Sequence, residues 1–197
     1  MSFSPASAII AAWLIWLLSW ILAAGWSART ASHDDLGAES PSRVLTLAAI
    51  VMIITSYWPL SPGTLWDTPE TIGWLFVGLV IVGFAFTWMA RLHLGPLWTS
   101  TLAPTEDHRI VDTGPYAIVR HPVYAGALLA ALATAAERGR IEALAGVGVL
   151  IAALSLRAKL EERFLRRDLG DAAYTAYRSR VPMLIPFAKI APRASAD

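Results

Sequence analysis

Five apolar stretches, each bounded by charged residues, constrain the fold of this 197-residue chain more than any other feature. They cover roughly residues 5–26, 44–60, 70–91, 122–136 and 143–156. A membrane-spanning helix needs about 20 mainly apolar residues, a length that the first three stretches reach, with some tilt. The last two are shorter and predict a helical hairpin that turns at residues 137–140. We therefore expect an all-α, polytopic membrane protein with about five transmembrane helices.

Composition supports this class. Only 16% of the residues are charged, whereas soluble domains carry about 25%. The first apolar stretch lacks a basic segment before it and is longer than the apolar part of a signal peptide, so we expect an uncleaved span. The chain has no cysteine, which excludes disulfides and thiol catalysis. A net charge of +1 gives no field that would attract nucleic acid.

The basic residues predict an orientation. With five spans, all but two of the sixteen Lys and Arg residues flank one side of the membrane, and only Arg138 and Arg140 flank the other. The positive-inside rule then places the N-terminus outside and the C-terminus in the cytoplasm. We expect an integral protein of a prokaryotic inner membrane. Residues 108–124 and the segment after residue 156 then share the cytoplasmic face.

Polar chemistry is concentrated in residues 108–124, which carry two of the four histidines and the turn-forming pair Gly114-Pro115. Ionisable groups at a membrane edge are costly, so such a cluster is a functional-site hypothesis. Taken singly, His121-Pro122 also fits a simple helix start. We interpret His33 and His93 as surface or interface histidines. No spacing typical of a metal site occurs, and we expect no metal.

The segment after residue 156 predicts two amphipathic helices. Leu160, Phe164 and Leu165 recur at helical spacing among basic residues, and Gly170 interrupts the helix. Tyr174, Tyr177 and Val181 then recur before Pro182. A basic helix that binds anionic lipid explains part of this pattern.

Two adjacent glutamates, Glu161 and Glu162, stand inside this basic segment. Arg157 and Glu161 lie four residues apart, as Glu162 and Arg166 do, so ordinary helix ion pairs explain both. A carboxylate at this depth is also well placed to hold a cationic ligand.

Two blocks of residues resemble the integral-membrane methyltransferases, a superfamily that includes isoprenylcysteine carboxyl methyltransferase and phosphatidylethanolamine N-methyltransferase. The first block is His108-x-Ile-Val-x-Thr-Gly-Pro-Tyr-x-x-x-Arg-His-Pro-x-Tyr-x-Gly126. The second contains Glu161-Glu162, Leu169-Gly170, Tyr174-x-x-Tyr177 and Val181-Pro182. The resemblance covers roughly residues 91–187. Residues 92–95 lack the Gly-x-Gly element of phospholipid methyltransferases, and the chain lacks the extra spans of the isoprenylcysteine enzymes.

The resemblance implies methyl transfer from S-adenosylmethionine, with S-adenosylhomocysteine as product, to a lipophilic acceptor. It implies a cytoplasmic cofactor site formed by the segment before the fourth helix and the amphipathic C-terminal helices. The cofactor-binding positions implied are His108, Ile110, Val111, Tyr116, Arg120, His121, Pro122, Tyr124 and Glu161. Arg157 and Glu161 are implied as catalytic, with Arg157 near the acceptor. Carboxylates and aromatic faces suit a sulfonium cation, which donates no hydrogen bond.

We expect three parts in the chain. Residues 1–90 form three transmembrane helices that face the acceptor and lipid, residues 91–187 form the catalytic part, and residues 188–197 form a tail. The expected partners are membrane lipids and a lipid or small lipophilic acceptor, such as a prenyl acid, a lipid amine or a thiol. No nucleic acid is expected, and no required protein partner is evident. Two alternatives stay open: an NADPH-dependent membrane sterol-type reductase, and a non-enzymatic lipid-binding protein.

Overall fold

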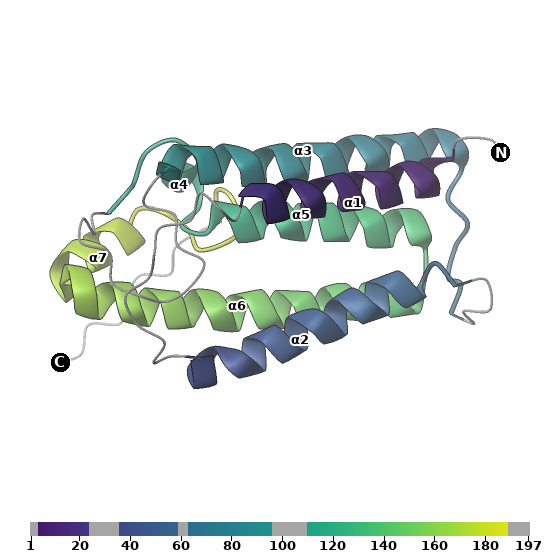
Figure 1. The fold of residues 1–197 in the computed structure, drawn as a ribbon. Helices are drawn as coiled ribbons and strands as arrows, with labels where there is room; N and C mark the ends of the chain where they lie inside the picture. Colours follow the sequence, from purple (N-terminus) through teal and green to yellow (C-terminus); the bar gives the residue numbers. More distant parts are fainter. Residues whose placement is uncertain (1–3, 24–35, 59–62, 96–109, 189–197) are drawn as a thin grey trace.

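The computed structural model describes residues 4–23, 36–58, 63–95 and 110–188, and these residues are helical apart from connecting turns and one isolated β-bridge between Thr64 and Arg140. Five helices of 17 residues or more lie lengthwise beside one another (Figure 1). They are α1 (Pro5–Ala23), α2 (Leu36–Thr55), α3 (Glu70–Leu94), α5 (Pro122–Arg138) and α6 (Ile141–Leu169). Two short helices, α4 (Pro115–Ile118) and α7 (Asp171–Arg178), lie at one end of this bundle.

Within the described residues, three helices are long and apolar enough to cross a membrane: α1, α3 and the part Ile141–Arg167 of α6. The all-α membrane class predicted from the sequence is confirmed. The apolar part of α2 is shorter, Pro41–Thr55, and α5 has 17 residues, so a span by each of these two helices stays a prediction. Helix α2 also begins at Leu36, before the charged Arg43 that bounds the second apolar stretch.

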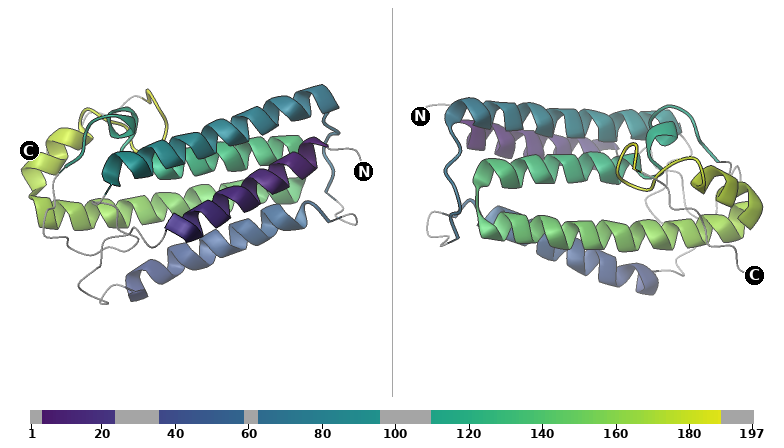
Figure 2. Two further views of the ribbon diagram at one scale, coloured as in Figure 1. Left: turned by 45° about the horizontal axis from the view of Figure 1, so that its top comes forward. Right: turned by 180° about the vertical axis from the view of Figure 1, so that it is seen from behind.

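The helices pack in two groups, α1 with α3 and α5, and α2 along α6 (Figure 2). Two glycines bring α3 and α5 unusually close. A Cβ atom on Gly83 would lie 2.6 Å from the carbonyl oxygen of Gly126, and the reverse distance would be 2.5 Å. Small residues at such a crossing let helix backbones approach each other, as is common in membrane bundles. This crossing sets the position of the first turns of α5.

The α5–α6 hairpin closes the bundle at the end opposite α4 and α7. Helix α5 ends at Gly139, which adopts the left-handed conformation with φ 59°. The backbone N–H of Leu65 donates to the carbonyl of Gly139 at 2.7 Å, and that of Ile141 donates to Gly63 at 2.9 Å. The hairpin turn predicted at residues 137–140 is present, and the chain before α3 covers it.

Helix α6 corrects one expectation. The apolar stretch that ends at residue 156 and the first amphipathic segment are a single 29-residue helix, with no break where the charged residues begin. At 1.5 Å per residue, α6 extends about 20 Å beyond Leu156. Arginine, lysine and glutamate are good helix formers, so a change of polarity alone does not end a helix. The predicted break at Gly170 is present, and α7 follows it.

Candidate active site

Glu161 lies at the centre of a cluster that joins α5 and α6. Arg157 Nε lies 3.2 Å from Glu161 Oε1, which is the predicted pairing of residues four apart. The Tyr124 hydroxyl donates to the same oxygen and accepts a hydrogen bond of 3.0 Å from Arg157 Nε. His121 Nδ1 lies 3.3 Å from Glu161 Oε2, and its ring stacks on Tyr124 with centroids 5.5 Å apart. Four side chains therefore meet here: His121 and Tyr124 of the first sequence block, Glu161 of the second, and Arg157 one helical turn before Glu161.

Glu162 forms a second, more deeply buried cluster beside the first. Its carboxylate oxygen Oε1 accepts from Arg120 Nε at 2.8 Å and lies 2.7 Å from Arg120 Nη2. His121 Nε2 lies 3.3 Å from that oxygen, so the imidazole ring bridges the two adjacent carboxylates. From the sequence, a ligand role was predicted only for Glu161, and Glu162 was explained by a helix ion pair with Arg166. Consecutive residues of a helix point about 100° apart, so two neighbouring glutamates can contact different partners. This helix geometry was the only sequence signal for a separate partner of Glu162.

His121 joins these clusters through its two ring nitrogens. Burial alone would lower the pKa of its imidazole, but hydrogen bonds and charge interactions with Glu161 and Glu162 outweigh burial and raise the pKa above its ordinary value. The imidazolium form donates from both ring nitrogens, as two carboxylate partners require. His121 also occupies the position before the N-terminus of α5, and Pro122 is buried at the first position of the helix, as predicted.

Arg120 and His121 also hold the chain that follows α7. The backbone N–H groups of these two residues donate to the carbonyls of Pro182 and Met183, at 2.9 and 3.1 Å. Arg120 Nη1 donates to the carbonyl of Arg178 at 3.3 Å and to that of Val181. The C-terminal segment 178–183 is therefore attached to the start of α5.

Tyr116 and Ile110 both contact α7. The Tyr177 hydroxyl donates to the Tyr116 carbonyl at 2.7 Å, and Ile110 packs against the buried cluster of Tyr174, Tyr177 and Val181. Burial raises the pKa of the Tyr116 hydroxyl well above its ordinary value, so this group stays protonated. The tyrosines predicted to share one face of this helix, Tyr174 and Tyr177, thus contact residues of the first sequence block.

The turn before α4 contacts His93, whose side chain is exposed, as expected for a surface histidine. Gly114 adopts φ 57°, and a Cβ there would lie 2.7 Å from the His93 ring. His93 Nε2 shares a hydrogen bond of 2.9 Å with Thr113 Oγ1, and its ring lies over that of Tyr116 with centroids 6.4 Å apart. His93 therefore supports the motif turn from the end of α3. Nothing in its local sequence marks this contact, which depends on the path of the chain after α3.

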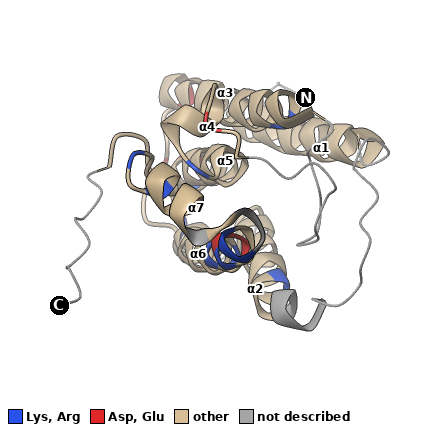
Figure 3. Cartoon of the chain, turned by 90° about the vertical axis from the view of Figure 1, so that its left-hand side faces the viewer, with Lys and Arg blue, Asp and Glu red and all other residues tan. Residues whose placement is uncertain are grey.

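The remaining predicted positions are placed as follows. Val111 is half-buried next to Ile110. His108 lies outside the described residues. Figure 3 looks onto this end of the bundle, where acidic and basic residues of α6 lie together and α7 carries a basic residue. Within the described part of the chain, no group of three or more His, Asp or Glu side chains could hold a metal ion.

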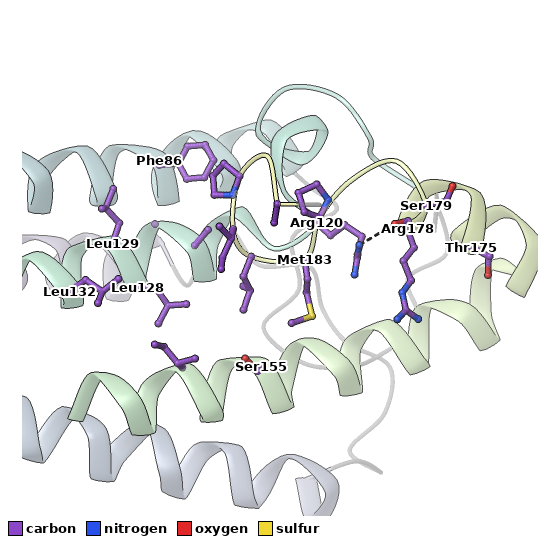
Figure 4. Close-up of a pocket in the computed structure, with 18 residues that line it drawn as sticks. Phe86, Arg120, Leu128, Leu129, Leu132, Ser155, Thr175, Arg178, Ser179 and Met183 are labelled. Carbon is purple, nitrogen blue, oxygen red and sulfur yellow. Dashed lines mark hydrogen bonds between the residues drawn. The ribbon is translucent and has the colours of Figure 1, made fainter. Parts of the chain in front are cut away.

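A cavity of about 1100 Å³ adjoins the Glu162 cluster between α5, α6 and the C-terminal segment (Figure 4). Arg120, Thr175, Arg178 and Ser179 line its polar end. Small-molecule sites usually enclose about 300–1,000 Å³, so the cavity is large enough for a nucleoside-sized ligand and part of a second molecule. Glu161 and Glu162 do not line the cavity, and both carboxylates are paired with basic side chains. By size alone, the cavity can therefore hold a nucleoside-sized ligand.

The fold and this site define an all-helical integral membrane protein with a cluster of ion pairs at one end of its helix bundle. Residues 76–167 match the isoprenylcysteine carboxyl methyltransferase (ICMT) family. The intramembrane Ras methyltransferase ICMT, a eukaryotic protein of known structure, aligns with 80% of this chain and 54% of its own, at a TM-score of 0.55 and 20% identity. That likeness shows a shared fold.

Curated relatives carry the comparison further. Methanethiol S-methyltransferase 2 of Bradyrhizobium diazoefficiens is 33% identical over 162 residues, which are 77% of this chain and 61% of the relative. Protein-S-isoprenylcysteine O-methyltransferase of Schizosaccharomyces pombe is 34% identical over 113 residues, 56% of this chain and 48% of the relative. The chain thus spans about half to three-fifths of these relatives. These matches confirm the predicted resemblance: the chain is related to the ICMT-like integral-membrane methyltransferases.

Proposed function

We propose that this chain is an integral-membrane methyltransferase that moves a methyl group from S-adenosylmethionine to a lipophilic acceptor at the cytoplasmic face. The observation that carries the proposal is the double carboxylate Glu161-Glu162, bridged by His121 and completed by Arg120, Tyr124 and Arg157. Most of these residues belong to the two blocks that resemble the family. Its relatives are named as S- and O-methyltransferases, which supports this reaction class over a reductase.

Each side chain has a role that its contacts support. When bound, S-adenosylmethionine supplies an electrophilic methyl group next to a sulfonium charge. Glu161 offers a carboxylate to the cationic end of the ligand, and Tyr124 offers an aromatic face. Arg157, whose guanidinium is one helical turn from Glu161, can orient an acidic acceptor through a bidentate contact. Positioning of the two reactants then provides most of the rate enhancement.

The direct test is incubation of the purified protein with isotopically labelled S-adenosylmethionine and a lipid extract, followed by mass spectrometry of the methylated product. We expect one or more lipophilic species to gain the labelled methyl group, and Glu161→Gln to abolish this. Glu70→Gln, an exposed glutamate at the start of α3, is the control and should transfer normally. If Arg157→Ala left transfer unchanged while Glu161→Gln removed it, Arg157 would lose its assigned role.

Ligand-induced stabilisation separates the proposal from the reductase alternative. Because a ligand that binds only the folded state raises the unfolding temperature, S-adenosylhomocysteine should raise it and NADPH should not. Stabilisation by NADPH alone would overturn the methyltransferase proposal.

The cytoplasmic assignment has its own test. Since the chain has no cysteine, a single introduced thiol reports one position. Ser179→Cys lies at the site end and Thr64→Cys at the hairpin end, and both positions are exposed. We expect a membrane-impermeant reagent to label Ser179→Cys only from the cytoplasmic side and Thr64→Cys only from the opposite side. The reverse pattern would contradict the orientation.

A further inference from the structure

The distal part of α6 carries basic residues along one face. Lys159, Arg163 and Arg167 follow one another at intervals of four residues, so their side chains leave the helix on the same side. All three are exposed. Figure 3 shows basic residues gathered at this end of the helix. These three residues form a continuous positive surface, which we call the basic stripe.

The basic stripe lies on the side of α6 that points away from the candidate active site. At 3.6 residues per turn, Arg163 and Glu161 point about 160° apart around the helix axis. Glu161 and Glu162 contact residues at the start of α5, namely Tyr124 and Arg120. The acidic residues of this helical segment therefore face into the protein, and the basic stripe faces out of it.

The charges of the basic stripe are not neutralised within the described part of the chain. Other basic residues at this end do have partners: Arg157 lies 3.2 Å from Glu161, and Arg180 lies 3.3 Å from Asp112. By contrast, no described residue forms an ion pair or a side-chain hydrogen bond with the three residues of the basic stripe. Like charges one helical turn apart repel each other, so the basic stripe favours an anionic partner from outside the chain.

The position of the basic stripe along α6 matches the headgroup layer of a bilayer. The hydrocarbon core is about 30 Å thick, which about 20 helical residues span at 1.5 Å per residue. Measured from Ile141, where α6 begins, this length ends near Leu160. The basic stripe extends from that boundary for about 12 Å along the helix, and the headgroup layer takes up roughly 5–8 Å of it. Because lysine and arginine side chains are long and can bend toward an interface, all three charges reach the level of the lipid phosphates.

We propose that the basic stripe binds the headgroups of anionic phospholipids in the leaflet that surrounds the site end of the bundle. Basic residues next to the end of a transmembrane helix attract an anionic leaflet, and each one near the surface strengthens binding about fivefold. The guanidinium groups of Arg163 and Arg167 suit bidentate contacts with phosphate oxygens. Bound lipid holds α6 at a fixed depth and so keeps Glu161, on the opposite face, near the hydrocarbon boundary. The inference is independent of the proposed function, because it requires neither a methyl donor nor an acceptor.

The test measures lipid binding to the full chain in detergent by mass spectrometry of the intact complexes. The two probes are phosphatidylglycerol, which is anionic, and phosphatidylcholine with the same acyl chains, which carries no net charge. We expect phosphatidylglycerol to bind roughly 10- to 100-fold more tightly, and the preference to shrink as the concentration of ammonium acetate rises, because salt screens exposed charges. The combined variant Lys159→Gln, Arg163→Gln and Arg167→Gln should bind the two lipids almost equally.

The matched control is the combined variant Lys159→Arg, Arg163→Lys and Arg167→Lys, which keeps all three charges and should keep the preference. Thermal unfolding midpoints in detergent report whether both variants are folded, and we expect them to stay close to that of the unsubstituted protein because the three positions are exposed. Equal binding of both lipids by the unsubstituted protein would overturn the inference, as would a full preference in the glutamine variant. Binding of polyglutamate without a preference for phosphatidylglycerol would assign the basic stripe to an acidic protein instead.

Discussion

Arg120 and Glu162, 42 positions apart in the chain, form a buried ion pair in which both Nε and Nη2 of the guanidinium contact one carboxylate oxygen, at 2.8 and 2.7 Å. Their side chains are only 5% and 7% exposed. Because Arg120 also donates to the carbonyls of Arg178 and Val181, the pair connects the start of α5, the distal part of α6 and the segment after α7. It is the main polar connection between the elements that enclose the cavity.

Breaking this pair should destabilise the protein strongly. Removing one partner of a buried ion pair leaves an uncompensated charge and typically costs about 3–5 kcal/mol. We expect Glu162→Gln and Arg120→Ala each to lower the thermal unfolding midpoint in detergent markedly. The double variant Arg120→Met with Glu162→Leu should recover part of the loss, since it leaves no buried charge of this pair without its partner. If the double variant were as unstable as the sum of the single changes, the pair would not be the cause.

Glu161→Gln should affect ligand binding more than stability, because the Glu161 carboxylate is more exposed than that of Glu162. A hydrogen bond to a charged group contributes about 1.5–3 kcal/mol, so the dissociation constant for S-adenosylhomocysteine should rise roughly 10- to 100-fold. Isothermal titration calorimetry in detergent measures this directly. An unchanged dissociation constant would remove Glu161 from the ligand site.

His121 should make stability depend on pH. The raised pKa means that the folded protein holds this proton more tightly than the unfolded chain, whose imidazole titrates near 6.5. The charged groups that face it are Glu161, Glu162 and, through Glu162, Arg120. Its contribution is complete below about pH 6.5 and is lost as the pH rises through the higher folded value. Unfolding midpoints recorded across this range should fall for the unsubstituted protein.

His121→Gln provides the comparison for that pH series. A neutral amide cannot lose a proton in this range, so the variant should show a flatter profile between about pH 6 and 9 than the unsubstituted chain. An equally steep decline in both proteins would assign the effect to another group.

Gly83→Ala should weaken the α3–α5 crossing. The added methyl group would lie 2.6 Å from the Gly126 carbonyl oxygen, so the helices must separate, and overpacking of this kind costs about 1–3 kcal/mol. Gly78→Ala in the same helix is the control, because a Cβ there meets nothing within 4 Å. That change should be neutral or stabilising, since alanine favours helix over glycine by about 1 kcal/mol. The order of the two unfolding midpoints distinguishes packing from helix propensity.

Local patterns made the helical class predictable. Apolar stretches, the glycine at the α5–α6 turn and the break at Gly170 are properties of neighbouring residues, as is the pairing of Arg157 with Glu161 one turn apart. The two sequence blocks also grouped His121 and Tyr124 with Glu161 in one site, and these three side chains are in contact. The continuity of α6 past residue 156 was not predictable from polarity, because helix formation tolerates charged residues.

The sequence alone was enough to predict the all-α membrane class and to group His121, Tyr124 and Glu161 in one candidate site. Three features follow from the three-dimensional structure alone: Glu162 pairs with Arg120, Gly114 lies against His93, and the cavity lies between α5 and α6. These contacts join residues far apart in the chain. They depend first on how closely the helices cross, and at Gly83 and Gly126 the lack of side chains allows a close approach. They depend also on the segment after α7, which returns to the start of α5. The spacing of residues along one helix predicts neither the closeness of a helix crossing nor the path of the segment after α7.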